Sequence, residues 1–143
     1  RNYWKSHNFA KMSDATIDVA VKYASNLPSD ECEIFFGLLA GEASNRNPED
    51  TAYPHRDATY VMNVHGRWQS PKDDEKCVSW ARKFYSDTAP QATGGVYVNI
   101  LTADETERVK AAYGPNYARL RKTKETYDSD NFFRLNQNIS PKS

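Results

Sequence analysis

The sequence predicts an α+β domain in which helices cover one face of a mainly antiparallel sheet. Two observations predict it. Strand-like segments at residues 31–40, 59–68 and 96–101 alternate with helical patterns, and the middle one alternates polar and apolar side chains as a sheet with one open face does. Interleaved helices would also suit parallel crossovers, but that alternation favours the antiparallel arrangement. The 143 residues fit a single domain.

The first half of the chain predicts a helix and then a strand. Ser13 can cap a helix that ends before Pro28. Its apolar positions recur at intervals of three and four residues: Ile17, Val21, Ala24 and Leu27. Residues 31–40 are rich in strand formers and suit a buried strand. The polar loop that follows, to about Arg56, is long enough to suggest a function.

A second strand is expected over Thr59–Trp68, followed by a second helix. A period of two places one set of the strand's side chains on one face, namely Val61, Asn63, His65 and Arg67, and the other set opposite, namely Tyr60, Met62, Val64 and Trp68. Ser70-Pro71 begins the helix, whose apolar stripe is Cys77, Trp80, Ala81 and Phe84.

The last third predicts a strand, two helices and a tail. Gly94-Gly95 precedes a third strand over Val96–Leu101, and a helix from about residue 102 ends at Gly114-Pro115. Another helix covers residues 116–127. In the tail we expect Phe132 and Phe133 to anchor the chain by burial and the amides of residues 136–138 to tie it by hydrogen bonds.

Composition excludes several classes of partner. Nineteen basic and nineteen acidic residues cancel without forming a basic stripe, so nucleic acid is not expected as a partner. No apolar run approaches the roughly 20 residues that span a bilayer, so we expect a soluble, cytoplasmic domain without a membrane partner. Cys32 and Cys77 lack further ligands at metal-site spacing and are expected to be buried thiols, with no metal.

Four ordered motifs resemble a known family. They are Tyr53-Pro54-His55-Arg56, Gly95-x-Tyr97-x-Asn99, Tyr113 to Leu120, and Asp128 to Ile139. Together they resemble the C-terminal region of berberine-bridge-enzyme-like FAD-linked oxidases, in the vanillyl-alcohol-oxidase-like superfamily. The resemblance covers most of the chain and implies a bacterial-type C-terminal fragment of a larger flavoprotein. Residues 1–92 would be its substrate-binding region and residues 93–143 its berberine-bridge-like segment.

The resemblance implies an antiparallel sheet that covers the flavin ring while alcohols or hydroxyl carbons are oxidised by hydride transfer. The implied partners are a small-molecule substrate and an FAD-binding domain of the parent protein, which would hold most of the FAD; the chain alone should be inactive. The chain's own sequence agrees, because its only glycine pair, Gly94-Gly95, precedes a strand and equally suits a tight turn.

Asn63 and His65 are the candidate catalytic residues on the second strand. Asn63 stands five residues before Trp68, where the family often carries the Glu or Gln that removes a substrate proton, but an amide is no base. His65 faces the same side, and the ordinary histidine pKa of about 6.5 suits a residue that accepts a proton. The alternative is a hydrogen-bonded histidine on a half-exposed sheet face.

Tyr97 and Asn99 are the other candidates, since the resemblance places this stretch against the flavin. Tyr97 is a catalytic and cofactor-binding candidate and Asn99 a cofactor-binding one, with a phenol and an amide able to address flavin edges or a substrate oxygen. Many family members carry a second tyrosine where this chain has Ile100. The alternative for Tyr97 is packing as a strand aromatic.

Two other readings remain open. The first is a non-enzymatic ligand-binding or assembly domain on the same scaffold, whose open sheet face needs a packing partner. A ferredoxin-like fold of unrelated ancestry would require all four motif matches to be coincidental.

Overall fold

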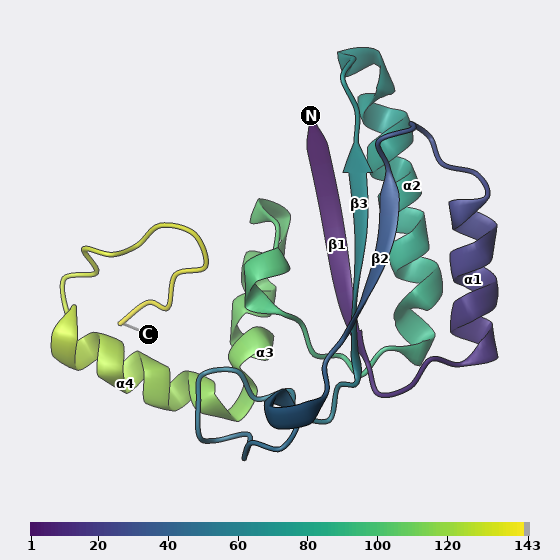
Figure 1. The fold of residues 1–143 in the computed structure, drawn as a ribbon. Coiled ribbons are helices and arrows are strands. Elements are labelled where there is room, and N and C mark those ends of the chain that lie inside the picture. The colour runs from purple at the N-terminus through teal and green to yellow at the C-terminus, as the bar shows by residue number, and fades with distance from the viewer. Residues whose placement is uncertain (142–143) are drawn as a thin grey trace.

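The computed structural model, which describes residues 1–141, is built on a three-stranded antiparallel sheet. Its strands are β1 (Asn2–Phe9), β2 (Glu33–Leu38) and β3 (Tyr60–Arg67), with β3 in the centre. The helices α1 (Asp14–Ala24) and α2 (Asp74–Thr88) lie together on one side of the sheet (Figure 1). The α+β prediction, with an antiparallel sheet and helices on one face, is therefore confirmed.

The core lies between the sheet and α2. Met62, Val64 and Trp68 meet the helix, whose predicted apolar stripe is buried at all four positions: Cys77, Trp80, Ala81 and Phe84. Both cysteines are free and buried, as predicted. Ser70 accepts a hydrogen bond from the Lys72 backbone N–H, and a short 3₁₀ turn, η2 (Pro71–Asp73), leads into α2.

The predicted first helix is present, but the face that it buries is not the one that carries the periodic apolar residues. Ser13 caps α1 by accepting a hydrogen bond from the Thr16 N–H at 3.2 Å. Three of the apolar residues that recur at helical spacing are exposed, namely Ile17, Val21 and Leu27. Val19, Ala20 and Tyr23 instead pack on the core, because a neighbouring face of the helix is turned towards α2.

The first and second strands also differ from expectation. No strand was expected over residues 2–9, yet β1 pairs with β3 along all eight residues. Its buried residues Lys5, Ser6, His7 and Asn8 are polar, so an apolar period was missing. β2 was expected to be buried, but it lies at the edge of the sheet and leaves Phe35 54% exposed.

The predicted third strand is not formed. Residues 96–101 make a loop and a 3₁₀ turn, η4 (Val98–Ile100), closed by hydrogen bonds from Ile100 N to Tyr97 O and from Leu101 N to Val98 O. Val96 and Leu101 pack with Val109 and Ala112 in a second small core. These local contacts, and not a strand partner, set the backbone.

The C-terminal helices lead away from the sheet (Figure 1). A capping box of Thr102 and Glu105 opens η5 (Ala103–Arg108), which runs into α3 (Val109–Tyr113). A turn, η6 (Gly114–Asn116), ends α3 as predicted and leads to α4 (Tyr117–Tyr127). Two further 3₁₀ turns are η1 (Gly41–Ala43) and η3 (Ala89–Gln91).

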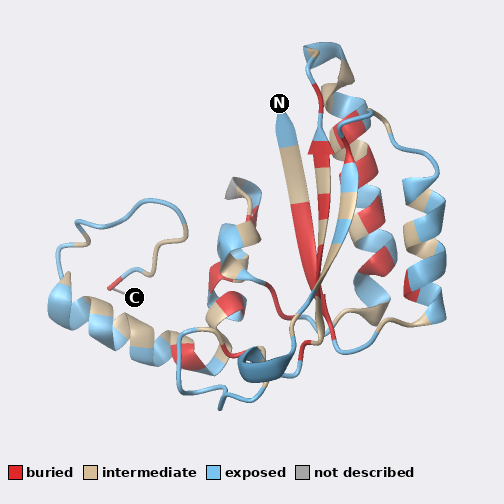
Figure 2. Ribbon diagram, in the orientation of Figure 1, coloured by how far each residue is buried: buried red, intermediate tan, exposed pale blue. Residues whose placement is uncertain are grey.

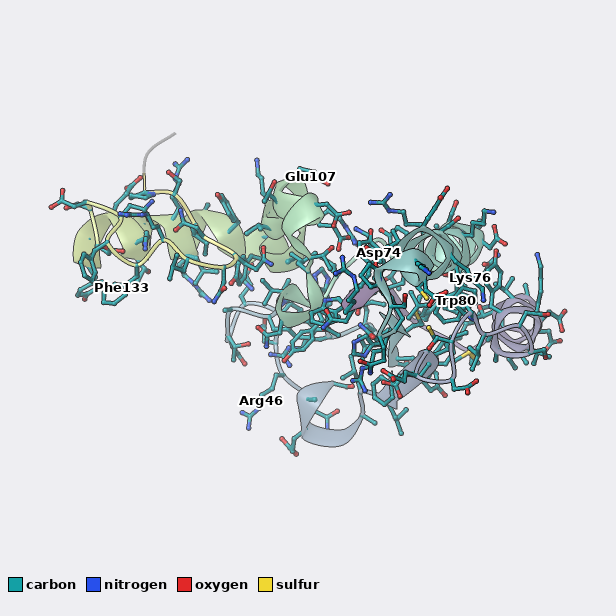
Figure 3. All side chains as sticks on the ribbon, turned by 90° about the horizontal axis from the view of Figure 1, so that it is seen from above. Arg46, Asp74, Lys76, Trp80, Glu107 and Phe133 are labelled. Atoms are coloured by element: carbon teal, nitrogen blue, oxygen red, sulfur yellow. The ribbon has the colours of Figure 1, made fainter. Side chains whose placement is uncertain are left out.

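The tail folds back along α4 but is mostly exposed (Figure 2). Gln137 ties it by donating from Nε2 to Leu101 O at 3.0 Å. Phe132 and Phe133, expected to be buried anchors, are each 76% exposed and contact one another edge to face. Figure 3 shows Phe133 far from Trp80 and the core of the domain.

Candidate functional site

The face of the sheet opposite α1 and α2 carries most of the candidate residues, and we call it the open face. Strand register sets its composition: Asn63 lies between Ser6 and Phe35, and His65 lies between Trp4 and Glu33. The predicted alternation of β3 is confirmed, since Met62 and Val64 belong to the core while Asn63 and His65 do not. Polar and aromatic side chains from three strands therefore share one surface.

Three successive open-face residues of β1 each carry a buried polar atom without a hydrogen-bond partner among the described residues. These atoms are the Trp4 Nε1, the Ser6 Oγ and the Asn8 Oδ1. Leaving a buried polar group unpaired costs about 1–3 kcal/mol. Such atoms call for a partner that the described residues do not supply. Sequence reasoning missed them because β1 itself was missed.

His65 lies in a small charged cluster on this face. Its Nδ1 lies 3.4 Å from the Glu33 Oε1, and the Arg67 Nε donates to its Nε2 at 3.3 Å. The Trp4 ring meets the imidazole edge to face at a centroid distance of 5.1 Å. Burial first, and then the Arg67 guanidinium, lower the pKa of His65 below its ordinary 6.5, against the effect of Glu33. His65 is therefore neutral at neutral pH.

Asn63 occupies the middle of the open face. It is half-buried, and its amide makes no hydrogen bond within residues 1–141 that would commit it elsewhere. Directly opposed side chains in an antiparallel pair have Cβ atoms about 5 Å apart, so Ser6 on β1 is its nearest polar neighbour across the ladder. The amide is thus available to a bound molecule.

Tyr97 and Asn99 are joined by a hydrogen bond, from the Asn99 Nδ2 to the Tyr97 hydroxyl at 2.8 Å. The expectation that strand alternation puts them on one face was wrong in its reason, because the segment is a 3₁₀ turn. Tyr97 also meets the Tyr53 ring edge to face at 5.8 Å. The Tyr53 hydroxyl in turn accepts a long hydrogen bond of 3.5 Å from the Asn8 Nδ2, which links the pair to β1.

The candidates therefore fall into two groups on one surface. Asn8, beside the tyrosines, is opposite Val61, whereas His65 is four residues further along β3. Four residues of strand correspond to about 13 Å. Asn63 lies between the groups. The structure brings Tyr97 and Asn99 together but does not bring His65 into contact with them.

The long polar loop before β3 supports the tyrosine group. The His55 ring lies against Gly95, and its Nε2 is 3.1 Å from Ala112 O. Arg56 anchors the loop by donating to Ala43 O at 2.8 Å and to the Thr51 hydroxyl at 2.6 Å. The His-Arg motif thus holds the loop and the glycine segment against each other.

Some kinds of site receive no support from the described part of the chain. Within residues 1–141, no group of three or more His, Cys, Asp or Glu side chains could hold a metal ion. Likewise, none of the helices there has the length and apolar character that crossing a membrane requires. A cleft of about 410 Å³ does lie beside Asn99, lined in part by the tail residues 135–137.

Comparison with known proteins agrees with the motifs. Residues 96–140, which include Tyr97 and Asn99, match the family described as berberine and berberine-like. An uncharacterised FAD-linked oxidoreductase, YgaK of Bacillus subtilis (strain 168), is 29% identical over 130 residues, covering 91% of this chain and 29% of the relative. The chain is therefore homologous to FAD-linked oxidoreductases of the berberine-bridge-enzyme-like family, and its residues 96–140 carry a segment of that family.

Further relatives of this berberine-bridge-like chain extend the comparison. The chitooligosaccharide oxidase of Gibberella zeae is 33% identical over 106 residues, or 70% of this chain and 22% of that protein. The crystal structure of a glycopeptide hexose oxidase with teicoplanin has a TM-score of 0.84 at 24% identity over 98% of this chain and 32% of that one, which shows the shared fold. The chain spans between about a fifth and a third of the length of these relatives.

Proposed function

We propose that this chain is the substrate-binding and flavin-covering part of an FAD-dependent oxidoreductase that oxidises an alcohol or hydroxyl carbon, inactive without an FAD-binding part of the parent protein. One observation carries the proposal. The open face presents Asn63 and His65, with the Tyr97–Asn99 pair at one end, beside the buried unpartnered atoms of β1. That surface suits a flat polar ring and a small hydroxylated molecule.

The residues present fit the ring of FAD and do not fit its pyrophosphate. The Trp4 Nε1 donor and the Asn8 Oδ1 acceptor are orphaned on the face that would meet the ring. A pyrophosphate requires successive free backbone N–H groups at a glycine-rich turn. The Gly95 backbone is instead covered by His55. Tyr97 and Asn99 would therefore touch the flavin ring, and the pyrophosphate would be held by the FAD-binding part.

When bound, FAD supplies the acceptor for a hydride from the substrate carbon. His65, neutral at neutral pH, is the proposed proton acceptor for the substrate hydroxyl. Asn63 would orient that hydroxyl with its free amide. The Tyr97 hydroxyl, which already accepts from Asn99, retains its own proton to donate to an oxygen of the substrate or cofactor.

Similarity to a chitooligosaccharide oxidase supports a substrate with hydroxyl-bearing carbons. Hydroxyl groups both donate and accept hydrogen bonds, as do the amide and imidazole of the open face. We therefore propose sugars and related alcohols as the first substrates to examine.

The proposal is tested with two proteins. The 143-residue chain should not form a stoichiometric yellow complex with added FAD, whereas the complete open reading frame containing it should be purified with flavin absorption. Anaerobic addition of alcohols or sugars should bleach that absorption. A complete polypeptide that holds no flavin would instead favour a non-enzymatic ligand-binding or assembly domain.

A further inference from the structure

Three side chains at one end of the open face are arranged as a relay around His65. Glu33 of β2 and Arg67 of β3 flank the imidazole, with the Arg67 Nη2 3.6 Å from the Glu33 Oε1. The register places Glu33 directly across the ladder from His65, and Arg67 two residues along the same strand face. No charged group of β1 joins them, because its residue opposite His65 is Trp4.

Hydrogen bonding defines the state of the imidazole. The Arg67 Nε carries a proton that it donates, so the His65 Nε2 must hold a lone pair. The neutral ring then carries its own proton on Nδ1, which faces the Glu33 carboxylate at 3.4 Å. The contact with Trp4 restricts rotation of the ring. A carboxylate behind one nitrogen and a lone pair on the other is the arrangement of an oriented general base.

We propose that Glu33 positions His65 as the proton acceptor for hydroxyl oxidation, and that Arg67 caps the accepting nitrogen until substrate replaces it. This inference rests on the proposed function. The substrate O–H bond breaks and its proton forms an N–H bond on the His65 Nε2, giving an imidazolium beside Glu33. The C–H bond breaks with its electron pair, and the hydride passes to oxidised flavin as the alcohol becomes a carbonyl.

The exposure of the three side chains suits these roles. The His65 side chain is 14% exposed, whereas those of Arg67 and Glu33 are 51% and 54% exposed. Arg67 can therefore leave Nε2 for solvent without disturbing the core. A half-exposed Glu33 is screened by water, so its effect on His65 is directional orientation with a modest electrostatic contribution.

The experiment compares two measurements on the same variants of the flavin-containing protein. NMR titration reports the pKa of His65, and the pH profile of kcat/KM for a hydroxylated substrate reports the base used in turnover. Removing a positive neighbour in R67M should raise the His65 pKa, and removing a negative one in E33Q should lower it. The acidic limb of the kcat/KM profile should move in the same direction in each variant.

Magnitudes separate the base from its positioning residue. H65Q should lose roughly 100-fold or more in kcat/KM, the usual contribution of a general base. E33Q should lose less, about 10-fold, mainly in kcat, and E33D should recover part of the loss because it restores an acceptor for Nδ1–H. E42Q breaks an exposed ion pair with Arg46 away from the open face and should change neither readout.

Two outcomes would overturn the inference. If the His65 titration shifts in E33Q and R67M while the acidic limb stays in place, His65 is not the base and the cluster is a cross-strand ion pair. If H65Q keeps the wild-type fold by circular dichroism and also keeps wild-type kcat/KM, the relay is wrong. A wild-type flavoprotein that oxidises no hydroxyl compound would instead refute the proposed function, and this inference with it.

Discussion

The His55 ring lies directly against the Cα of Gly95, so that a Cβ placed there would be 2.5 Å from the His55 Nδ1. This contact joins the loop before β3 to the segment that carries Tyr97 and Asn99. Because the neighbouring Tyr53 ring also packs on Tyr97, the loop determines where the phenol lies. Two motifs that are 40 residues apart in the sequence thus act as one structural unit.

Replacing Gly95 by alanine should therefore destabilise the protein. The added methyl must displace an aromatic ring that is held by a contact with Ala112 O, which costs typically about 1–3 kcal/mol. Thermal denaturation of G95A should show a lower Tm. In the double variant with His55→Ala the loss should be smaller than the sum of the two single losses; full additivity would show that the ring does not oppose the methyl group.

The core assignment predicts that a substitution on α2 lowers the free energy of unfolding far more than one on the exposed face of α1. Phe84→Ala on α2 removes a fully buried ring and should lower the free energy of unfolding by about 3–5 kcal/mol. Val21→Ser on α1 alters a side chain that is 58% exposed and should change it by less than about 0.5 kcal/mol. Urea unfolding measures both, and a large loss in V21S would restore the stripe expected from periodicity.

His7 should make stability depend on pH. It is buried and stacked on Tyr85 with ring centroids 4.0 Å apart, and burial lowers its pKa from 6.5 to about 4. The unfolded chain therefore binds a proton at higher pH than the folded one. Stability from this group is complete above about pH 6.5 and falls as the pH drops towards 4, by up to about 3 kcal/mol.

The comparison of wild type with H7Q isolates that effect. The lowered pKa values of Asp104 and Glu105 also cause loss of stability in acid, but mainly below the ordinary Glu value of 4.5. Urea midpoints between pH 4.5 and 6.5 should slope more steeply in wild type than in H7Q. Equal slopes would mean that His7 is protonated in the fold.

The buried ion pair of Lys5 and Glu105 predicts a loss of folding stability when Lys5 is replaced. Its ammonium lies 3.2 Å from the Glu105 carboxylate, and both side chains are less than a tenth exposed. K5M leaves a buried carboxylate with less compensation, at a cost of about 3 kcal/mol or more. K22M, which breaks an exposed pair with Asp87, should cost less than about 1 kcal/mol. Adding E105Q to K5M should recover stability, and failure to do so would place the loss elsewhere.

Local patterns in the sequence were sufficient for part of the fold. The polar and apolar alternation of β3 assigned both faces of the central strand, and the spacing of Cys77, Trp80 and Phe84 gave the buried side of α2. Ser13 gave the start of α1. Each of these features depends on residues that are close together in the chain, so the spacing of apolar residues or a capping serine is enough to predict it.

Other features depended on contacts that no local pattern records. β1 was not expected because its sequence is polar. Its polar residues are buried by contacts with distant segments: Lys5 meets an acidic turn about 100 residues away, and His7 stacks on Tyr85 of α2. Residues 96–101 have strand composition but pack on α3. For the same reason, Glu33 and Arg67 could not be assigned to His65 before the register of β2 and β3 was known.

The sequence alone determined the class of fold, the family and the polar face of the central strand, because these depend on the order and period of residues along the chain. Only the tertiary structure decided that Tyr97 bonds Asn99 in a 3₁₀ turn, that His55 fills the space beside Gly95, and that His65 lies between Glu33 and Arg67. These arrangements join segments that are distant in sequence, and their geometry is fixed by strand register and side-chain packing.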